Sequence, residues 1–175
     1  MPPVDHSSRP ALWTTDPSVW PANGEIDVVE AVNTATTGNQ MTLHTTSGCS
    51  MSSVKREETG EVLGTNCYNG TNDNQGCGVQ GPVDTFGASF NPNDGSVYAM
   101  ELRSAGIRVW FFARAAIPST TGGPLTGSPD PSSWGTPMAD FPSTGCNIGS
   151  HFRNQSIVAN IDLCGQYAGQ EKYYT

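Results

Sequence analysis

The sequence predicts an all-β protein built as an antiparallel β-sandwich or jelly roll. Short runs of β-type residues recur along the chain between Gly, Pro, Asn and Ser, whereas helical periodicity is nearly absent. The 20 Gly and 13 Pro supply many turn positions. A chain of 175 residues is long enough for one domain with a hydrophobic core. Many short strands separated by turns are typical of sandwiches and jelly rolls.

Five segments have the composition and alternation of strands. In chain order, we expect strands at residues 24–31, 40–45, 96–102, 107–113 and 157–163. The turn Leu-Arg-Ser-Ala-Gly-Ile joins the third and fourth strands as a hairpin. The segment 115–145 is rich in Pro, Gly, Ser and Thr, which predicts one long surface loop.

Composition and charge argue against several classes of partner. Charged residues make up only 14% of the chain, and the formal net charge is −8. No basic stripe is visible, so nucleic acid is not an expected partner. No apolar run approaches the roughly 20 residues that a membrane-spanning helix needs, so we expect no membrane partner. We expect the protein to be a monomer.

The cysteines indicate an oxidising compartment. Five are present, namely Cys49, Cys67, Cys77, Cys146 and Cys164. None forms a CxxC pair or stands beside a histidine cluster, which argues against a zinc site and favours disulfides. We expect one bridge between Cys67 and Cys77, and at least one thiol without a partner in this chain. Sequons at Asn69 and Asn154 fit the same extracellular or cell-wall location, although residues 1–10 contain no apolar signal-peptide core.

The stretch Gly-Glu-Ile-Asp-Val-Val-Glu, residues 24–30, places three acids in what otherwise reads as a buried strand. Side chains alternate along a strand, so Glu25 and Asp27 share one face. Strict alternation would bury Glu30 among the apolar side chains, which is costly. A β-bulge at Val28-Val29 shifts the phase by one residue and returns Glu30 to the acidic face.

Two glutamates on one face are suited to cleaving glycosidic bonds. Their side chains can bring the carboxyl groups about 5–5.5 Å apart, the spacing of retaining glycosidases. Neighbouring negative charges raise the pKa of at least one acid, so one glutamate can attack while another donates a proton. The alternative is an acidic strand that faces solvent, or part of a cation site. The short pattern alone does not separate these readings.

The surrounding sequence resembles glycoside hydrolase family 16, in its laminarinase-like branch with an E-x-D-x-x-E active-site strand. The similar segments are LWTTDPSVWPANGEIDVVEAVN, NQMTLHTTSGC, GCGVQGP, YAMELRSAGIRVWFFAR, GCNIGSHF and IVANIDLCGQYAG. They follow the family's order over residues 11–170 and look most like fungal endo-β-1,3(4)-glucanases. The resemblance implies a concanavalin A-like jelly roll and cleavage of β-1,3- or mixed β-1,3/1,4-glucan with retention of configuration.

The resemblance also implies roles for individual residues. In the family the first glutamate is the nucleophile, the aspartate assists and the last glutamate is the acid/base, which here implies catalytic roles for Glu25, Asp27 and Glu30. No metal or organic cofactor is implied. The implied substrate-binding residues are Trp13, Trp20, His44, Asn160 and Tyr167. Strand alternation adds Gln40, which shares a polar face with His44. The alternative for the tryptophans is core packing, and for the histidine a structural role satisfied by backbone groups.

The chain departs from the family in its length. Family domains carry several strands before the catalytic strand and more chain after the last similar segment, so we expect a sandwich that is incomplete at both ends. We divide the chain into a tail at 1–10, the central part of one catalytic domain at 11–170 and a divergent end at 171–175. We expect it to be poorly stable or to aggregate, because strand edges and apolar surface would face water. A non-catalytic, glucan-binding remnant is the alternative function.

Overall fold

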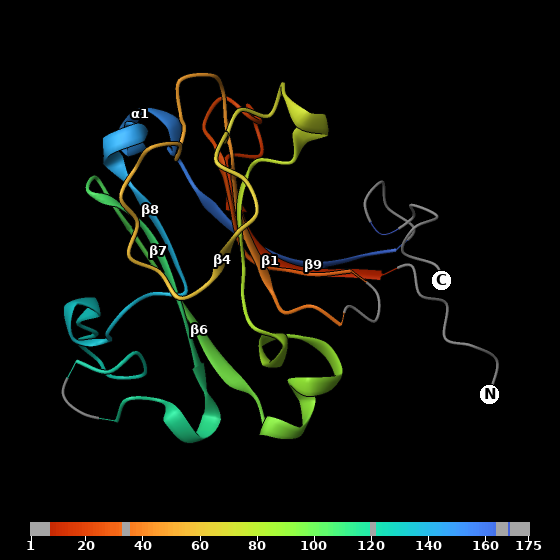
Figure 1. Cartoon of the computed structure of the whole chain (residues 1–175), viewed down its shortest axis with the longest axis vertical. Helices are drawn as coiled ribbons and strands as arrows, with labels where there is room; N and C mark the ends of the chain where they lie inside the picture. The colour runs from red at the N-terminus through yellow and green to blue at the C-terminus, as the bar shows by residue number, and fades with distance from the viewer. Residues whose placement is uncertain (1–7, 33–35, 120–121, 164–167, 169–175) are drawn as a thin grey trace.

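The computed structural model describes residues 8–32, 36–119, 122–163 and 168. These residues form two antiparallel sheets that pack against each other, as the sandwich prediction requires (Figure 1). The larger sheet has the strand order β4-β5-β3-β2-β1-β9, and the smaller has the order β6-β7-β8. The strands are β1 Ser8–Thr15, β2 Glu25–Glu30, β3 Gln40–His44, β4 Glu61–Val62, β5 Cys77–Gln80, β6 Ser96–Arg103, β7 Gly106–Ala113, β8 Ala139–Pro142 and β9 Ser156–Leu163.

Helical structure in the described residues is confined to single turns. The one α-helical turn is α1, Ile148–His151. The 3-10 turns are η1 Asn72–Asn74, η2 Val83–Thr85, η3 Gly87–Ser89, η4 Asn91–Asn93, η5 Arg114–Ala116, η6 Pro131–Ser133 and η7 Ser143–Gly145. None of these helices is long and apolar enough to cross a bilayer.

The five expected strands are present as β2, β3, β6, β7 and β9, and the predicted hairpin turn joins β6 to β7. The prediction of one long loop at 115–145 was wrong for its C-terminal part, where Ala139–Pro142 form strand β8. Ala139 and Phe141 of β8 are buried and pair with β7, because their side chains complete the core. The boundary of the expected tail at residue 10 also needs correction. β1 begins at Ser8, since residues 8–10 pair with the end of β9.

The core lies between the two sheets and follows the strand alternation. Ile26 and Val28 of β2 point into it, together with Met41 and Leu43 of β3. The smaller sheet contributes Ile107, Val109, Ala139 and Phe141. Because the apolar side chains of β2 and β3 face this core, their polar side chains are left on the opposite face of the larger sheet.

Two disulfides tie loops to this framework. The expected bridge between Cys67 and Cys77 is present, and a second joins Cys49 to Cys146. The second bridge links residues 97 positions apart in sequence, whereas the first closes a segment of only 10. The remaining cysteine, Cys164, lies outside the described residues.

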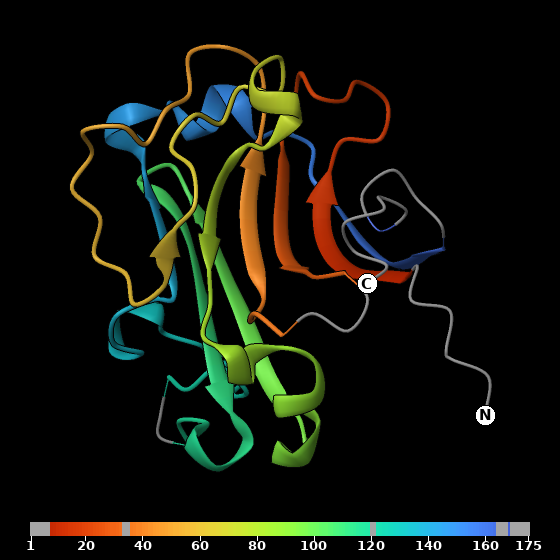
Figure 2. The same ribbon diagram turned by 45° about the vertical axis from the view of Figure 1, so that its right-hand side comes forward.

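The outer end of the larger sheet has an uncovered apolar surface. Ile157, Ile161 and Leu163 alternate along β9 and are 80%, 67% and 74% exposed. Figure 2 shows β1 and β9 on the side of the larger sheet that lies away from β6, β7 and β8. The described part of the smaller sheet therefore covers β2 and β3 but leaves this surface in contact with water.

This apolar surface predicts self-association. We expect Ile161→Lys to reduce both light scattering at high protein concentration and the fluorescence of a dye that binds apolar surface, because a charge in the patch disfavours its burial between molecules. Leu125 is 65% exposed and lies outside β1 and β9, so Leu125→Lys is the matched control and should change neither signal. Equal scattering and dye binding for the wild type and Ile161→Lys would contradict the prediction.

Candidate active site

The predicted bulge in β2 is present. Asp27 pairs with Thr42 and Glu30 with Gln40, so three steps along β2 match two steps along β3. The pairing of β2 with β1 shifts at the same place. The extra residue changes the phase of the alternation. Glu30 therefore joins Glu25 and Asp27 on the face opposite the core.

Asn39, which the sequence analysis did not single out, holds the bulge in place. Its side chain Nδ2 donates a hydrogen bond to the Val28 carbonyl (2.8 Å), and its Oδ1 accepts one from the Glu30 backbone N–H (2.9 Å). Asn39 has no exposed surface, and its own N–H donates to Thr85 Oγ1. Backbone groups that lose ladder partners at a bulge need such replacements when they are buried. An asparagine directly before β3 was the available sequence signal.

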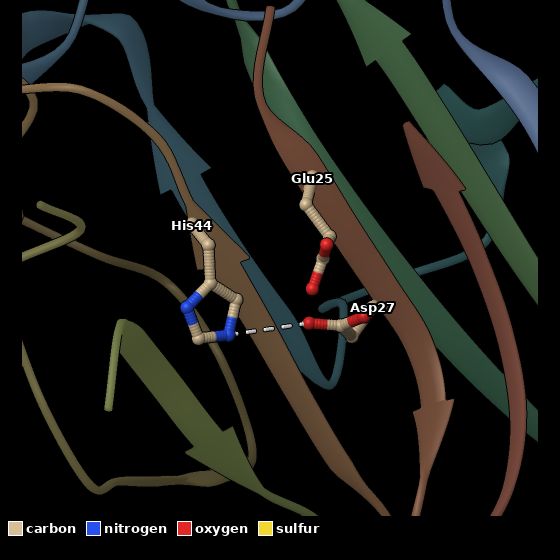
Figure 3. Close-up of side chains that lie close together, drawn as sticks. All are labelled: Glu25, Asp27 and His44. Atoms are coloured by element: carbon tan, nitrogen blue, oxygen red, sulfur yellow. Dashed lines mark ion pairs between the residues drawn. The ribbon is translucent and has the colours of Figure 1, made fainter. Parts of the chain in front are cut away.

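Glu25, Asp27 and His44 lie close together on adjacent strands (Figure 3). His44 Nε2 is 3.4 Å from Asp27 Oδ2, and Asp27 is only 5% exposed. His44 Nδ1 is 3.0 Å from Asn74 Oδ1, an oxygen that can only accept, so Nδ1 carries the proton. Asn74 belongs to the turn next to the Cys67–Cys77 bridge, and sequence reasoning did not predict this contact.

Glu25 is positioned by a hydrogen bond from Trp20 and by the tight turn at Gly24. Trp20 Nε1 donates a hydrogen bond of 2.6 Å to Glu25 Oε2. Gly24, directly before it, has a φ of +74°, and a Cβ there would meet the His151 carbonyl oxygen at 2.4 Å. Only glycine fits this turn without displacing the backbone of α1. The indole of Trp20 is 46% exposed, so it remains accessible to a ligand while it holds Glu25.

Glu30 contacts an arginine that was assigned to the N-terminal tail. Arg9 Nη1 lies 2.6 Å from Glu30 Oε1, and Arg9 Nη2 lies 2.6 Å from Asp162 Oδ2 on β9. Glu30 itself is only 9% exposed. The alternation of Arg9 with Ala11 and Trp13 could have placed it on the site face. That inference required knowing that residues 8–15 form a strand.

The environment raises the pKa values of both glutamates. Burial is the largest cause for each, the charge of Asp27 adds to it, and the pKa of Glu25 and of Glu30 rises to about 7. The Trp20 hydrogen bond opposes this rise for Glu25, and the Arg9 guanidinium opposes it for Glu30. For His44, burial acts to lower the pKa, but the carboxylates of Asp27, Glu25 and Glu30 together outweigh it and the pKa is raised. The site can therefore hold protons near neutral pH.

The same three side chains are close enough to form a candidate cation site. Ligand-type atoms of Glu25, Asp27 and His44 lie within 4.8 Å of one another. The Glu25 carboxylate, however, already accepts from Trp20, and His44 is directed at Asp27. Compact spacing of this kind equally serves proton exchange between carboxyl groups. The close approach of the three side chains therefore has an explanation in proton exchange as well as in ion binding.

Three of the expected binding residues lie on the face that carries the acids, namely Trp13, Gln40 and Asn160. Trp13 pairs with Asp27 across β1 and β2, and its Nε1 donates to Asn160 Oδ1 at 2.9 Å. Gln40 lies opposite Glu30 and is half-buried. The structure brings these residues to the face that carries the acids. Tyr167 lies outside the described residues.

An antiparallel sandwich with two glutamates on one sheet face has the architecture and the acid pair of β-sandwich glycoside hydrolases. The particular family follows from sequence comparison. Residues 1–175 match the family model described as the XgeA-like, catalytic GH16 domain. The chain therefore belongs to glycoside hydrolase family 16, as its motifs indicated.

The proteins that are similar in sequence to this chain include two from fungi. The chain is 47% identical over 174 residues to a probable glycosidase of Schizosaccharomyces pombe, covering 98% of this chain and 40% of that protein. It is 37% identical over 160 residues to the endo-1,3(4)-β-glucanase xgeA of Emericella nidulans, covering 91% of this chain and 24% of that enzyme. The chain thus spans less than half the length of these relatives.

Solved structures of the family superpose closely on the chain. Laminarinase 16A from Phanerochaete chrysosporium, solved with two β-glucans in its donor and acceptor sites, gives a TM-score of 0.90 at 42% identity. The match covers 98% of this chain and 58% of the laminarinase. An elongating family 16 β-1,3-glucosyltransferase gives a TM-score of 0.81 at 40% identity, covering 93% of this chain and 52% of that one.

Proposed function

We propose that the chain is the central part of a retaining endo-hydrolase of β-1,3- or mixed β-1,3/1,4-glucan. The observation that carries this proposal is the bulge in β2, which brings Glu30 to the same face as Glu25 and Asp27. Both glutamates have pKa values raised to about 7, a range that suits proton donation and nucleophilic attack near neutral pH. Membership of family 16 supports the substrate class.

The proposed reaction has two displacements. Glu30 gives its proton to the glycosidic oxygen while the Glu25 carboxylate attacks the anomeric carbon, so the C–O bond to the leaving sugar breaks and a glycosyl–enzyme ester forms. Glu30 then takes a proton from water, whose oxygen attacks the anomeric carbon and releases Glu25. Trp20 favours the ionised nucleophile, because its N–H donates to the Glu25 carboxylate.

Asp27 and His44 support the two glutamates. The negative charge of Asp27 raises the pKa of both, which keeps a shared proton available within the site. His44 holds Asp27 from the neighbouring strand and is itself held by Asn74. Their role in the proposal is to keep the acids in position and balance their charge, and no step requires a cofactor.

The proposed sugar contacts among the described residues come from the face that carries the acids. Trp13 and Trp20 present indoles that can stack on the apolar faces of sugar rings. Gln40, Asn160 and Tyr167 are proposed as hydrogen-bonding or stacking partners. Two disulfides and the sequons support an extracellular or cell-wall location. We propose that the whole enzyme acts as a monomer, whereas we expect this chain to self-associate through the apolar surface of β9.

Product analysis with laminarin and a mixed-linkage β-glucan tests this function. We expect short oligosaccharides to appear from within the polymer, and NMR of the first products to show the β-anomer, as retention requires. Longer products would instead indicate glucosyl transfer, the activity named for one structural neighbour. Binding of laminarin without any cleavage would favour the glucan-binding alternative and would refute the hydrolase proposal.

A further inference from the structure

Arg9 is a charged residue on the site face that the proposed reaction does not use. It alternates with Ala11 and Trp13 along β1, and Ala11 is paired with Glu30 across β1 and β2. Arg9 is also paired with Asp162 on β9. The strand pairing therefore places its guanidinium between two carboxylates that are 132 positions apart in sequence, at residues 30 and 162.

The guanidinium contacts both carboxylates through different nitrogens. Nη1 lies 2.6 Å from Glu30 Oε1, and Nη2 lies 2.6 Å from Asp162 Oδ2. The side chain of Glu30 is 11% exposed, and that of Arg9 is 27% exposed. Charge-assisted bonds to a planar guanidinium fix orientation as well as distance. The Glu30 carboxyl is therefore held toward β1, the strand that carries Arg9.

These contacts extend into a chain of hydrogen bonds. Asp162 Oδ1 accepts from Asn160 Nδ2 at 2.7 Å, and Asn160 Oδ1 accepts from Trp13 Nε1 at 2.9 Å. The chain connects a proposed sugar-stacking indole to Glu30 through Arg9. Each member is held by the next, so Arg9 does not depend on a single contact for its position.

We propose that Arg9 is a positioning residue, whose guanidinium on β1 bridges the Glu30 carboxyl of β2 and the Asp162 carboxyl of β9 and governs how readily Glu30 gives up its proton. The inference rests on the proposed function, because it assigns Glu30 a proton to donate. It goes beyond that function by adding a residue outside the acidic strand. In this proposal the Asp162 carboxylate is a second counter-charge, which contacts the same guanidinium as Glu30.

The charges that face Glu30 come from several strands. Asp27 on β2 raises the pKa of Glu30 beyond the rise that burial causes, whereas Arg9 on β1 and His44 on β3 act to lower it. Asp162 on β9 acts through Arg9. Removing the Arg9 cation takes away a lowering effect, so the pKa of Glu30 should rise. Removing the Asp162 charge leaves Arg9 free to act on Glu30 alone, so that pKa should fall.

The two substitutions should therefore shift the pKa of Glu30 in opposite directions. The pH dependence of kcat/KM for laminarin tests this expectation. The high-pH limb marks loss of the proton that Glu30 must donate. We expect Arg9→Met to move this limb upward by about 1 pH unit. Asp162→Asn should move it downward by a smaller amount, and Arg9→Lys should stay close to the wild type because it keeps the charge.

A direct titration keeps the inference separate from the proposed function. The carbon-13 shift of the Glu30 carboxyl, assigned by its loss in Glu30→Gln, should titrate at higher pH in Arg9→Met and at lower pH in Asp162→Asn. If the wild type cleaves no glucan, the proposed function fails, and this titration still decides the effect of Arg9. Unchanged limbs and unchanged titrations in both variants, with only a loss of stability in urea, would overturn the inference.

Discussion

Glu25→Gln is expected to lower kcat for laminarin by on the order of 10⁴- to 10⁶-fold, because the neutral amide cannot form the glycosyl ester. Glu30→Gln removes the proton donor and should cost about 10²–10⁴-fold. Both substitutions keep the side-chain shape, so the fold should remain intact by circular dichroism. Glu61→Gln on β4, where the side chain is exposed, is the matched control and should keep full activity.

Azide distinguishes the two roles. In Glu30→Ala the ester still forms, and azide replaces water from the face that water would use, which yields a β-glycosyl azide. In Glu25→Ala azide enters the space left by the nucleophile and yields the α-anomer. NMR of the products identifies the anomer. Azides of the opposite anomers would exchange the assignments of Glu25 and Glu30, and rescue of neither variant would contradict a double displacement.

Asn39→Ala is expected to lower both stability and activity, although Asn39 lies outside the acidic strand. It leaves the buried Glu30 N–H and Val28 carbonyl without partners, and each such group costs about 1–3 kcal/mol. We therefore expect the free energy of unfolding in urea to fall by about 2–6 kcal/mol. We also expect kcat to fall in the fraction that remains folded, because the bulge no longer directs Glu30 to the site.

Asn93 provides the comparison for this substitution. It is exposed, and its side chain donates only to the Ser89 carbonyl. Asn93→Ala should change the unfolding free energy by no more than about 0.5 kcal/mol. If Asn39→Ala were equally mild, or if it lowered stability while kcat stayed at the wild-type value, the bulge would not depend on Asn39.

Local patterns determined the acidic strand. Alternation in residues 24–30 fails at one position only, and the cost of burying Glu30 leaves a bulge as the simple solution. Both features are local to residues 24–30, and the pairing of β2 with β3 confirms the bulge. The other four expected strands were found because their β-type residues are bounded by turn residues, which are also local signals. β8 was missed because it spans only Ala139–Pro142 within a Pro- and Gly-rich segment, too short for a period to be visible.

The surroundings of the acids were decided by tertiary structure. Arg9 meets Glu30 only because β1 lies between β2 and β9, and Asn74 meets His44 only because a disulfide-closed turn folds beside β3. The sequence by itself determined which face of β2 the three acids share, since that follows from alternation and the cost of burying charge. Which groups set the protonation of those acids was decided by strand order, because electrostatic interaction depends on distance in space and not on position in the chain.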